Sequence, residues 1–159
     1  MRSSSLLRPI GFRPSEISSM VNQIVVHQHV EEAASLWMQR DRAVVAPQYR
    51  LKDLARLDER LEAHVDGQRI GCAAAWDAAV AQLEQGAGEV FAASVMAFES
   101  DDRNRADKVL DVACSAPSLM RGLISALGWM NVDSAAIQAR RLIQTGGPEA
   151  FRAGQSGFL

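Results

Sequence analysis

Three segments in the second half of the chain follow one pattern, and this repetition restricts the fold more than any other feature of the sequence. They begin at Gly88 (GEVFAASVMAFE), Pro117 (PSLMRGLISALG) and Pro148 (PEAFRAGQSGFL). Each has a helix-starting Gly or Pro, a polar residue directly after it and a hydrophobic pair at the same offset. The segments start about 30 residues apart, a period typical of stacked helical hairpins. We therefore expect each segment to be the second helix of a hairpin.

The stretches between these segments have the pattern of first helices. They read RNRADKVLDVACSA and VDSAAIQARRLIQTGG, and Asp102 and Asp133 stand where a capping side chain is expected. Hydrophobic spacing predicts that one face of each helix is buried. The residues expected there are Ala106, Val109, Leu110 and Ala113, then Ala136, Ile137, Ala139 and Ile143. The competing interpretation is an ordinary bundle whose Ala- and Leu-rich helices resemble one another by chance.

The first half is also predicted to be helical. Residues 1–20 have the pattern of an irregular leader, because prolines and a glycine interrupt any helix there. Hydrophobic spacing then predicts helices over about 22–40, 51–65 and 72–85. In the second of these, the residues expected to face inward are Leu51, Leu54, Leu57, Leu61 and Val65.

Strand-like alternation is not evident anywhere, so the sequence predicts an all-α fold. The chain has 159 residues, which suits one domain. We expect a single helical domain over 21–159, with N-terminal helices in 21–86 and stacked hairpins in 87–159.

Composition narrows the classes of function. The formal net charge is −2, whereas a general duplex-DNA binder needs a clear positive excess. A signal peptide needs about 7–15 apolar residues and a membrane span about 18, and neither is present. Cys72 and Cys114 lie in apolar helical contexts and are expected to be buried, reduced thiols. We therefore expect a cytoplasmic protein that binds neither nucleic acid nor membrane.

The repeated half resembles HEAT repeats, in which helical hairpins stack into a curved α-solenoid. A longer stretch, residues 30–70 (VEEAASLWMQRDRAVVAPQYRLKDLARLDERLEAHVDGQRI) followed by AWDAAVAQLEQGAGEVFAASVMAFES, looks like the N-terminal region of a poorly characterised bacterial HEAT-repeat family. The likeness covers roughly residues 20–155. Members of that family are often encoded near type VI secretion genes. The resemblance implies an immunity protein or effector adaptor, with a secretion effector or component as partner.

The end of the chain departs from that family, whose members continue with further repeats. Here the third segment runs into GQSGFL, where Gly154 and Gly157 weaken a helix by about 1 kcal/mol each relative to alanine. We expect an apolar edge around Ile137, Leu142 and Phe151. Either a second copy covers this edge in a homodimer, or the chain is a truncated, self-associating remnant.

The stretch HQHVEE raises the question of a metal site. In a helix, His27 and His29 point about 160° apart, so they cannot ligate one ion together. Some HEAT-fold enzymes hold iron through His-Glu dipeptides, but this chain has none, and His64 lies on another predicted helix. We therefore expect no metal ion.

Other catalytic patterns are weak. Asp58, Glu62 and Asp66 form an acidic row that could serve acid–base chemistry, but a solvated helix face paired with Arg56 and Arg60 explains it better. The glycines of EQGAGEV lack the strand and the Lys-Ser/Thr pair of a phosphate-binding loop. No catalytic residue and no cofactor are expected.

The remaining candidate is a binding surface. Arg121 and Arg152 occupy equivalent positions on successive second helices, which line the concave face of a HEAT stack. They could form a short basic ladder for an acidic partner, or they could be ordinary solvated residues. The sequence therefore favours a non-enzymatic protein-interaction scaffold. The alternative is an enzyme on a HEAT scaffold, such as a glycosylase or lyase.

Overall fold

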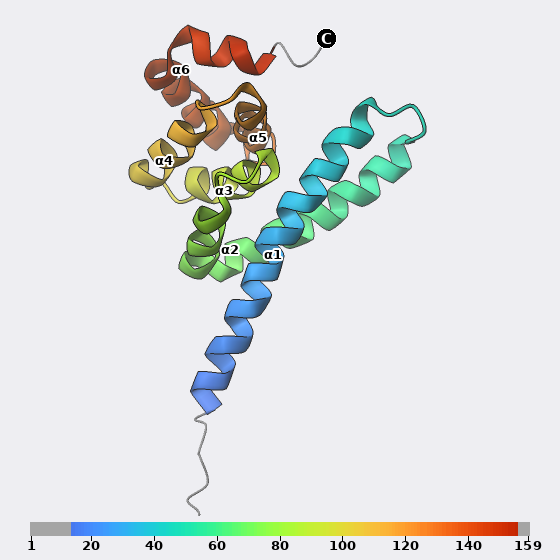
Figure 1. The fold of residues 1–159 in the computed structure, drawn as a ribbon, viewed down its shortest axis with the longest axis vertical. Helices are drawn as coiled ribbons and strands as arrows, with labels where there is room; N and C mark the ends of the chain where they lie inside the picture. The colour runs from blue at the N-terminus through green and yellow to red at the C-terminus, as the bar shows by residue number, and fades with distance from the viewer. Residues whose placement is uncertain (1–13, 156–159) are drawn as a thin grey trace, which may run out of the picture.

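The structure is a computed structural model that describes the backbone of residues 14–155 and the side chains of residues 22–144. Within these ranges all regular secondary structure is helical, which confirms the all-α prediction. The six helices are α1 (Pro14–Val45), α2 (Leu51–Gln82), α3 (Ala87–Glu99), α4 (Arg103–Ala113), α5 (Pro117–Leu127) and α6 (Val132–Gln155) (Figure 1). None of the helices, over the residues described, is both long and apolar enough to cross a membrane.

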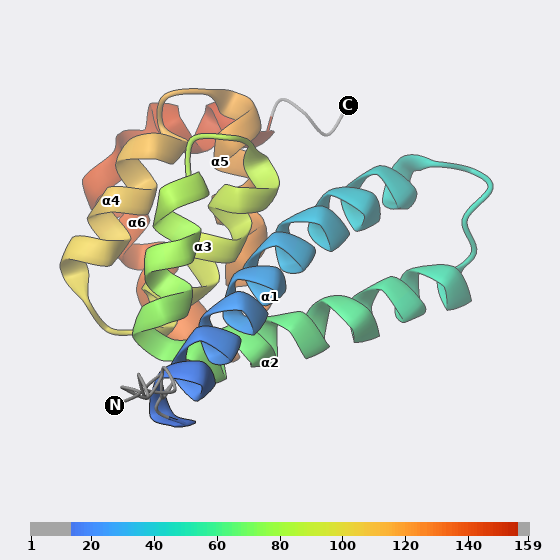
Figure 2. The ribbon, with the colours of Figure 1, turned by 60° about the horizontal axis from the view of Figure 1, so that its bottom comes forward.

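Helices α1 and α2 form a long hairpin that extends away from the other helices (Figures 1 and 2). Helix α1 begins at Pro14, earlier than the sequence predicts, so the expected irregular leader is wrong for residues 14–20. Proline suits the first turn of a helix, where its missing N–H has no partner to lose. Residues 1–13 lie outside the described part.

Helix α2 joins two predicted helices across a kink. At Cys72 the backbone has φ 48° and ψ −118°, which is not helical. The expected break between residues 65 and 72 contains Gly67 and Gly71, which lie inside the helix, and the kink falls directly after them. A Cβ atom on Gly67 would lie 2.5 Å from the ring of His29 on α1. Gly67 therefore allows α1 and α2 to approach closely and does not end the helix.

Helix α3 is the centre of the molecule and contacts each of the other five helices. Its large hydrophobic side chains, Val90, Phe91, Val95 and Phe98, are all buried. A helix that is apolar on every side needs neighbours on every side. Trp37 of α1 stacks on Phe91 and donates a hydrogen bond to Ser125 Oγ of α5, at 2.8 Å. The core therefore links the hairpin to the second half of the chain.

Helices α4 and α5 agree well with the predictions. The side chain of Asp102 accepts a hydrogen bond from the backbone N–H of Asn104, so it caps α4 as expected. Ala106, Val109 and Ala113 are buried, and Pro117 begins α5. Helices α3 and α5 lie against each other, and α4 contacts both.

Helix α6 contradicts four predictions. It continues through Pro148 to Gln155 as one helix, so the predicted third hairpin is wrong; Figure 1 shows that α6 bends before its final turns. Proline removes one helix hydrogen bond, and a bend is a common result. Asn131, not Asp133, accepts the hydrogen bond from the N–H of Ser134 and caps the helix.

The predicted buried face of α6 is also wrong. Gln138 and Leu142 are buried, whereas Ile137 and Ile143 are exposed. Because alanines lie on several sides of this helix, hydrophobic spacing alone cannot distinguish its faces. The expected apolar edge of Ile137, Leu142 and Phe151 does not form as one surface, since Leu142 is buried. The side chain of Phe151 lies outside the described residues.

Candidate protein-interaction site

Of the two arginines in the predicted basic ladder, only Arg121 has a described side chain. Arg121 lies on α5, where its Nε donates to Asp41 Oδ1 at 2.8 Å and its Nη2 lies 2.7 Å from the same oxygen. Asp41 is on α1, so this ion pair ties the hairpin to α5. The side chain of Arg152 lies outside the described residues. A role in partner binding for either arginine stays a prediction.

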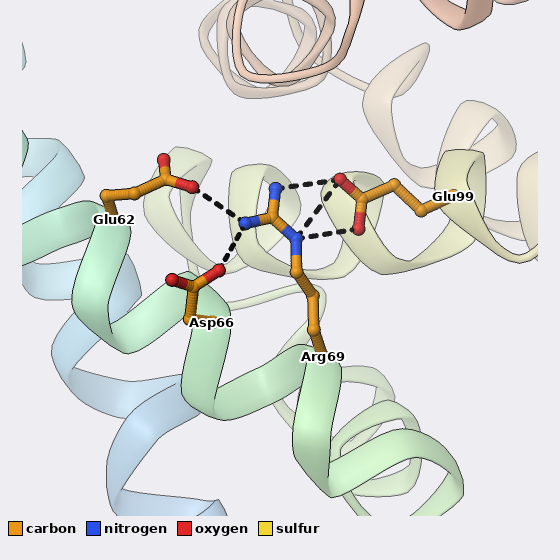
Figure 3. Close-up of polar contacts among 4 residues, drawn as sticks. All are labelled: Glu62, Asp66, Arg69 and Glu99. Atoms are coloured by element: carbon orange, nitrogen blue, oxygen red, sulfur yellow. Dashed lines mark hydrogen bonds and ion pairs between the residues drawn. The ribbon is translucent and has the colours of Figure 1, made fainter.

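The acidic row of α2 forms ion pairs between helices and is not simply a solvated face. Asp58 pairs with Arg40 of α1. Glu62 and Asp66 each lie 2.7 Å from Nη1 of Arg69, and Glu99 of α3 lies 2.8 Å from its Nη2 (Figure 3). Hydrogen bonding to Glu99, and then to Glu62 and Asp66, raises the pKa of Arg69 above its ordinary value. Arg69 therefore fastens the hairpin to α3.

Sequence reasoning missed this cluster because Arg69 and Glu99 belong to different helices. It assigned Arg56 and Arg60 as partners of the acidic row, on the basis of their closeness in the chain. The structure pairs the row with Arg40 and Arg69 instead. Only the packing of α1 and α3 against α2 brings these groups together.

A small pocket of about 340 Å³ adjoins the Arg69 cluster. It is lined by Arg69, Cys72, Ala73, Met96, Glu99, Ser100 and Arg105. Cys72 and Cys114 are free thiols, but both residues are exposed, so their predicted burial is wrong. Partial desolvation, followed by the nearby Asp111, raises the pKa of Cys114. A raised pKa leaves less thiolate at neutral pH and so lowers reactivity.

The three histidines separate into a pair and a single residue. His27 lies 3.7 Å from Glu31 on the same helix. His29 instead meets His64 of α2, with their Nδ1 atoms 3.1 Å apart. Burial, followed by the charge of His29, lowers the pKa of His64. In the part of the chain with described side chains, no three histidine, cysteine or acidic residues gather closely enough to hold a metal ion.

The most distinctive exposed surface is the end of the α1–α2 hairpin. Val44, Val45, Tyr49 and Leu51 are all exposed there, Val45 to 76% and Leu51 to 86%. We call these four residues the hairpin tip. The prediction that Leu51 faces inward is wrong. Helix α1 ends at Val45, so the hydrophobic stripe of α2 extends beyond the end of α1, and Leu51 has no partner there to cover it.

Basic residues border the hairpin tip. Arg42, Arg50 and Lys52 are exposed and lie within a few residues of it in the chain. The tip stands clear of α3–α6 in both views of the ribbon (Figures 1 and 2). Trp37, which contacts α3 and α5, precedes Val45 by about two helical turns, so α1 extends about 12 Å beyond that contact. The tip is therefore a projecting, apolar and cationic surface.

Comparison with known proteins gives no match. Neither a family model, nor a curated protein, nor a solved structure matches the chain. The function of the hairpin tip must therefore be inferred from its own chemistry.

Proposed function

We propose that this protein is a non-enzymatic protein-interaction scaffold that binds its partner through the hairpin tip. One observation carries the proposal: four large hydrophobic side chains are exposed together at the end of a projecting hairpin. Clustered exposed apolar residues mark interaction sites far more strongly than scattered ones do. Their burial on a partner would recover the hydrophobic free energy that folding leaves unused.

The size and charge of the tip define the partner. Burying a Val or Leu side chain completely is worth about 1.5–3 kcal/mol, so a few such residues can anchor an interface. Arg42, Arg50 and Lys52 favour acidic groups at the rim of the contact. The partner would therefore present an apolar groove with carboxylates around it.

The resemblance noted in the sequence supplies a biological setting for this proposal. We place the chain in the bacterial cytoplasm, as an immunity protein or effector adaptor associated with type VI secretion. We further propose that α3–α6 are a short HEAT-like stack. This is supported by the side-by-side packing of α3 and α5, with α4 against both.

Affinity capture with matched variants tests the role of the tip. The tagged chain would be incubated with lysate of its source cells, and bound proteins quantified by mass spectrometry. The test variant is Val45→Ser/Leu51→Ser. The control is Ile24→Ser/Ile70→Ser, which alters two equally apolar residues that are 65% and 84% exposed, away from the tip.

The expected result is a stoichiometric partner that the control variant retains and the tip variant loses. If the tip variant retains the partner, the binding site lies elsewhere on the protein. Sedimentation of the purified chain provides the second readout. If the wild type forms dimers that only the tip variant disrupts, the tip is a self-association surface and the proposal of a separate partner is wrong.

A further inference from the structure

A second surface feature lies on the opposite part of the chain from the hairpin tip. It is a groove of about 450 Å³ between α4 and α6, lined by Arg103, Asp107, Ile137, Arg140, Arg141 and Gln144. We call it the α4–α6 groove. In Figure 2, α4 and α6 lie next to each other on the side of the helical stack away from the hairpin.

The spacing of the lining residues shows how the groove is built. Arg103 and Asp107 are four residues apart on α4 and therefore share a face. The lining residues of α6, from Ile137 to Gln144, fall at i, i+3, i+4 and i+7, which is also one helical face. Two helical stripes thus form the walls of one continuous groove.

The groove carries positive charge. Three of its side chains are guanidinium groups, and Asp107 supplies one carboxylate. Arg103 and Arg140 are exposed, and among the described residues neither has a hydrogen-bond or ion-pair partner. These two groups are therefore available to an incoming anion without breaking an existing contact.

The third arginine is held in position from within. Gln138, which is buried, donates a hydrogen bond to the carbonyl oxygen of Phe98 at 3.2 Å. Nη1 of Arg141 in turn donates to Gln138 Oε1 at 3.3 Å. A side chain positioned in this way loses less entropy on binding than a free one.

We propose that the α4–α6 groove binds an acidic segment of a partner protein. Carboxylates of that segment would pair with Arg103 and Arg140, and a hydrophobic side chain would pack on Ile137, which is exposed in the groove. A protein segment fits better than nucleic acid, because a peptide can combine spaced carboxylates with a hydrophobic side chain, as the mixed lining of arginines and Ile137 requires, whereas a phosphate backbone carries a charge at every step. The inference does not depend on the hairpin tip.

Fluorescence anisotropy with defined probes tests this proposal. The probe is a fluorescein-labelled, glutamate-rich peptide with a central leucine, and its lysine-rich counterpart serves as the charge control. The test variant is Arg103→Gln/Arg140→Gln. The control variant, Arg56→Gln/Arg60→Gln, removes the same charge from two exposed arginines of α2.

We expect the groove variant to weaken binding of the acidic peptide roughly tenfold, and the control variant to leave it almost unchanged. Arg103→Lys/Arg140→Lys keeps the charge and should lose only part of the affinity, since Lys lacks the planar fork. This variant also covers the case in which the glutamine variant does not fold.

Three outcomes would overturn the proposal. Equal weakening by both glutamine variants would mean that long-range charge attracts the peptide without a groove. Absence of binding at low ionic strength would remove the acidic segment as a ligand. Tighter binding of single-stranded DNA of the same length would assign the groove to nucleic acid. A failure of this proposal does not bear on the proposal for the hairpin tip. The tip is tested by Val45→Ser/Leu51→Ser, which changes neither α4 nor α6.

Discussion

At Cys72 the backbone adopts a positive φ of 48°, a conformation that residues other than glycine rarely adopt. The kink separates residues 51–71 of α2 from its last turns, where Gln82 still reaches Glu31 of α1. The Cys72 thiol donates a hydrogen bond to the carbonyl oxygen of Arg69 at 3.3 Å, which compensates little of the strain. Strain of this kind costs on the order of 1–3 kcal/mol.

Replacing Cys72 with glycine should therefore stabilise the protein. Glycine adopts this conformation without the steric cost of a Cβ atom, although it loses more entropy on folding. We expect Cys72→Gly to raise the free energy of unfolding by about 1 kcal/mol, measured by urea denaturation. Cys72→Ala is the control, because it removes the thiol but keeps the Cβ atom, and it should give no gain. A gain of the same size from alanine would contradict the explanation by strain.

At the scale of the helices, the α1–α2 hairpin contains one contact that depends on protonation. His29 and His64 share a hydrogen bond between their Nδ1 atoms, which requires that one of these nitrogens be unprotonated. Glu32 raises the pKa of His64 and Arg60 lowers it, but burial and His29 dominate, so the net shift is downward. The folded hairpin therefore favours neutral His64.

This shift predicts a loss of stability in mild acid. Because the pKa of His64 is lower in the folded chain than its ordinary 6.5, the unfolded chain binds a proton more readily below that pH. Stability is fully present above pH 6.5 and declines as the pH falls towards the folded pKa. We expect thermal unfolding between pH 7.5 and pH 5 to show a smaller decline in His64→Gln than in the wild type. His27→Gln, which alters an exposed histidine of α1, should behave like the wild type; equal declines in all three would refute the role of His64.

At the scale of the whole molecule, Arg69 is one of the contacts that attach the hairpin to the rest. Its guanidinium joins two carboxylates of α2 to Glu99 at the end of α3 (Figure 3). Without it, the three carboxylates would lose the positive charge that they share. Arg69 is about one-third exposed, so water and salt screen part of this interaction.

Arg69→Ala should lower the free energy of unfolding by about 1–2 kcal/mol, a range that allows for this screening. The difference from the wild type should shrink when sodium chloride is added, because salt weakens the repulsion among the three carboxylates. Arg56→Ala removes an exposed arginine and should change stability by less than about 0.5 kcal/mol. Salt-independent destabilisation would show that packing of the arginine stem, and not its charge, is what matters.

The sequence predicts the positions of helices better than it predicts which helices pack against each other. Periodic hydrophobic residues and Asp102 correctly locate α4 and α5, because spacing and capping are local properties. The faces of α6 could not be predicted, since alanine fits both a buried and an exposed position. Arg69, His64 and the hairpin tip were missed for one reason: each depends on which helix lies opposite, or on where that helix ends. Such information arises only from tertiary packing.

The central position of α3 and the free position of the hairpin tip place different parts of the chain under different selection. Because α3 as a whole contacts the five other helices and most of its side chains are buried, most variants there should be eliminated. The tip residues are 46–86% exposed, so changes among them should cost folding little. Homologous proteins could therefore acquire new partners by varying a few residues around positions 42–52 while keeping the same interior. Sequence divergence concentrated at that one turn would be the evolutionary record of such changes.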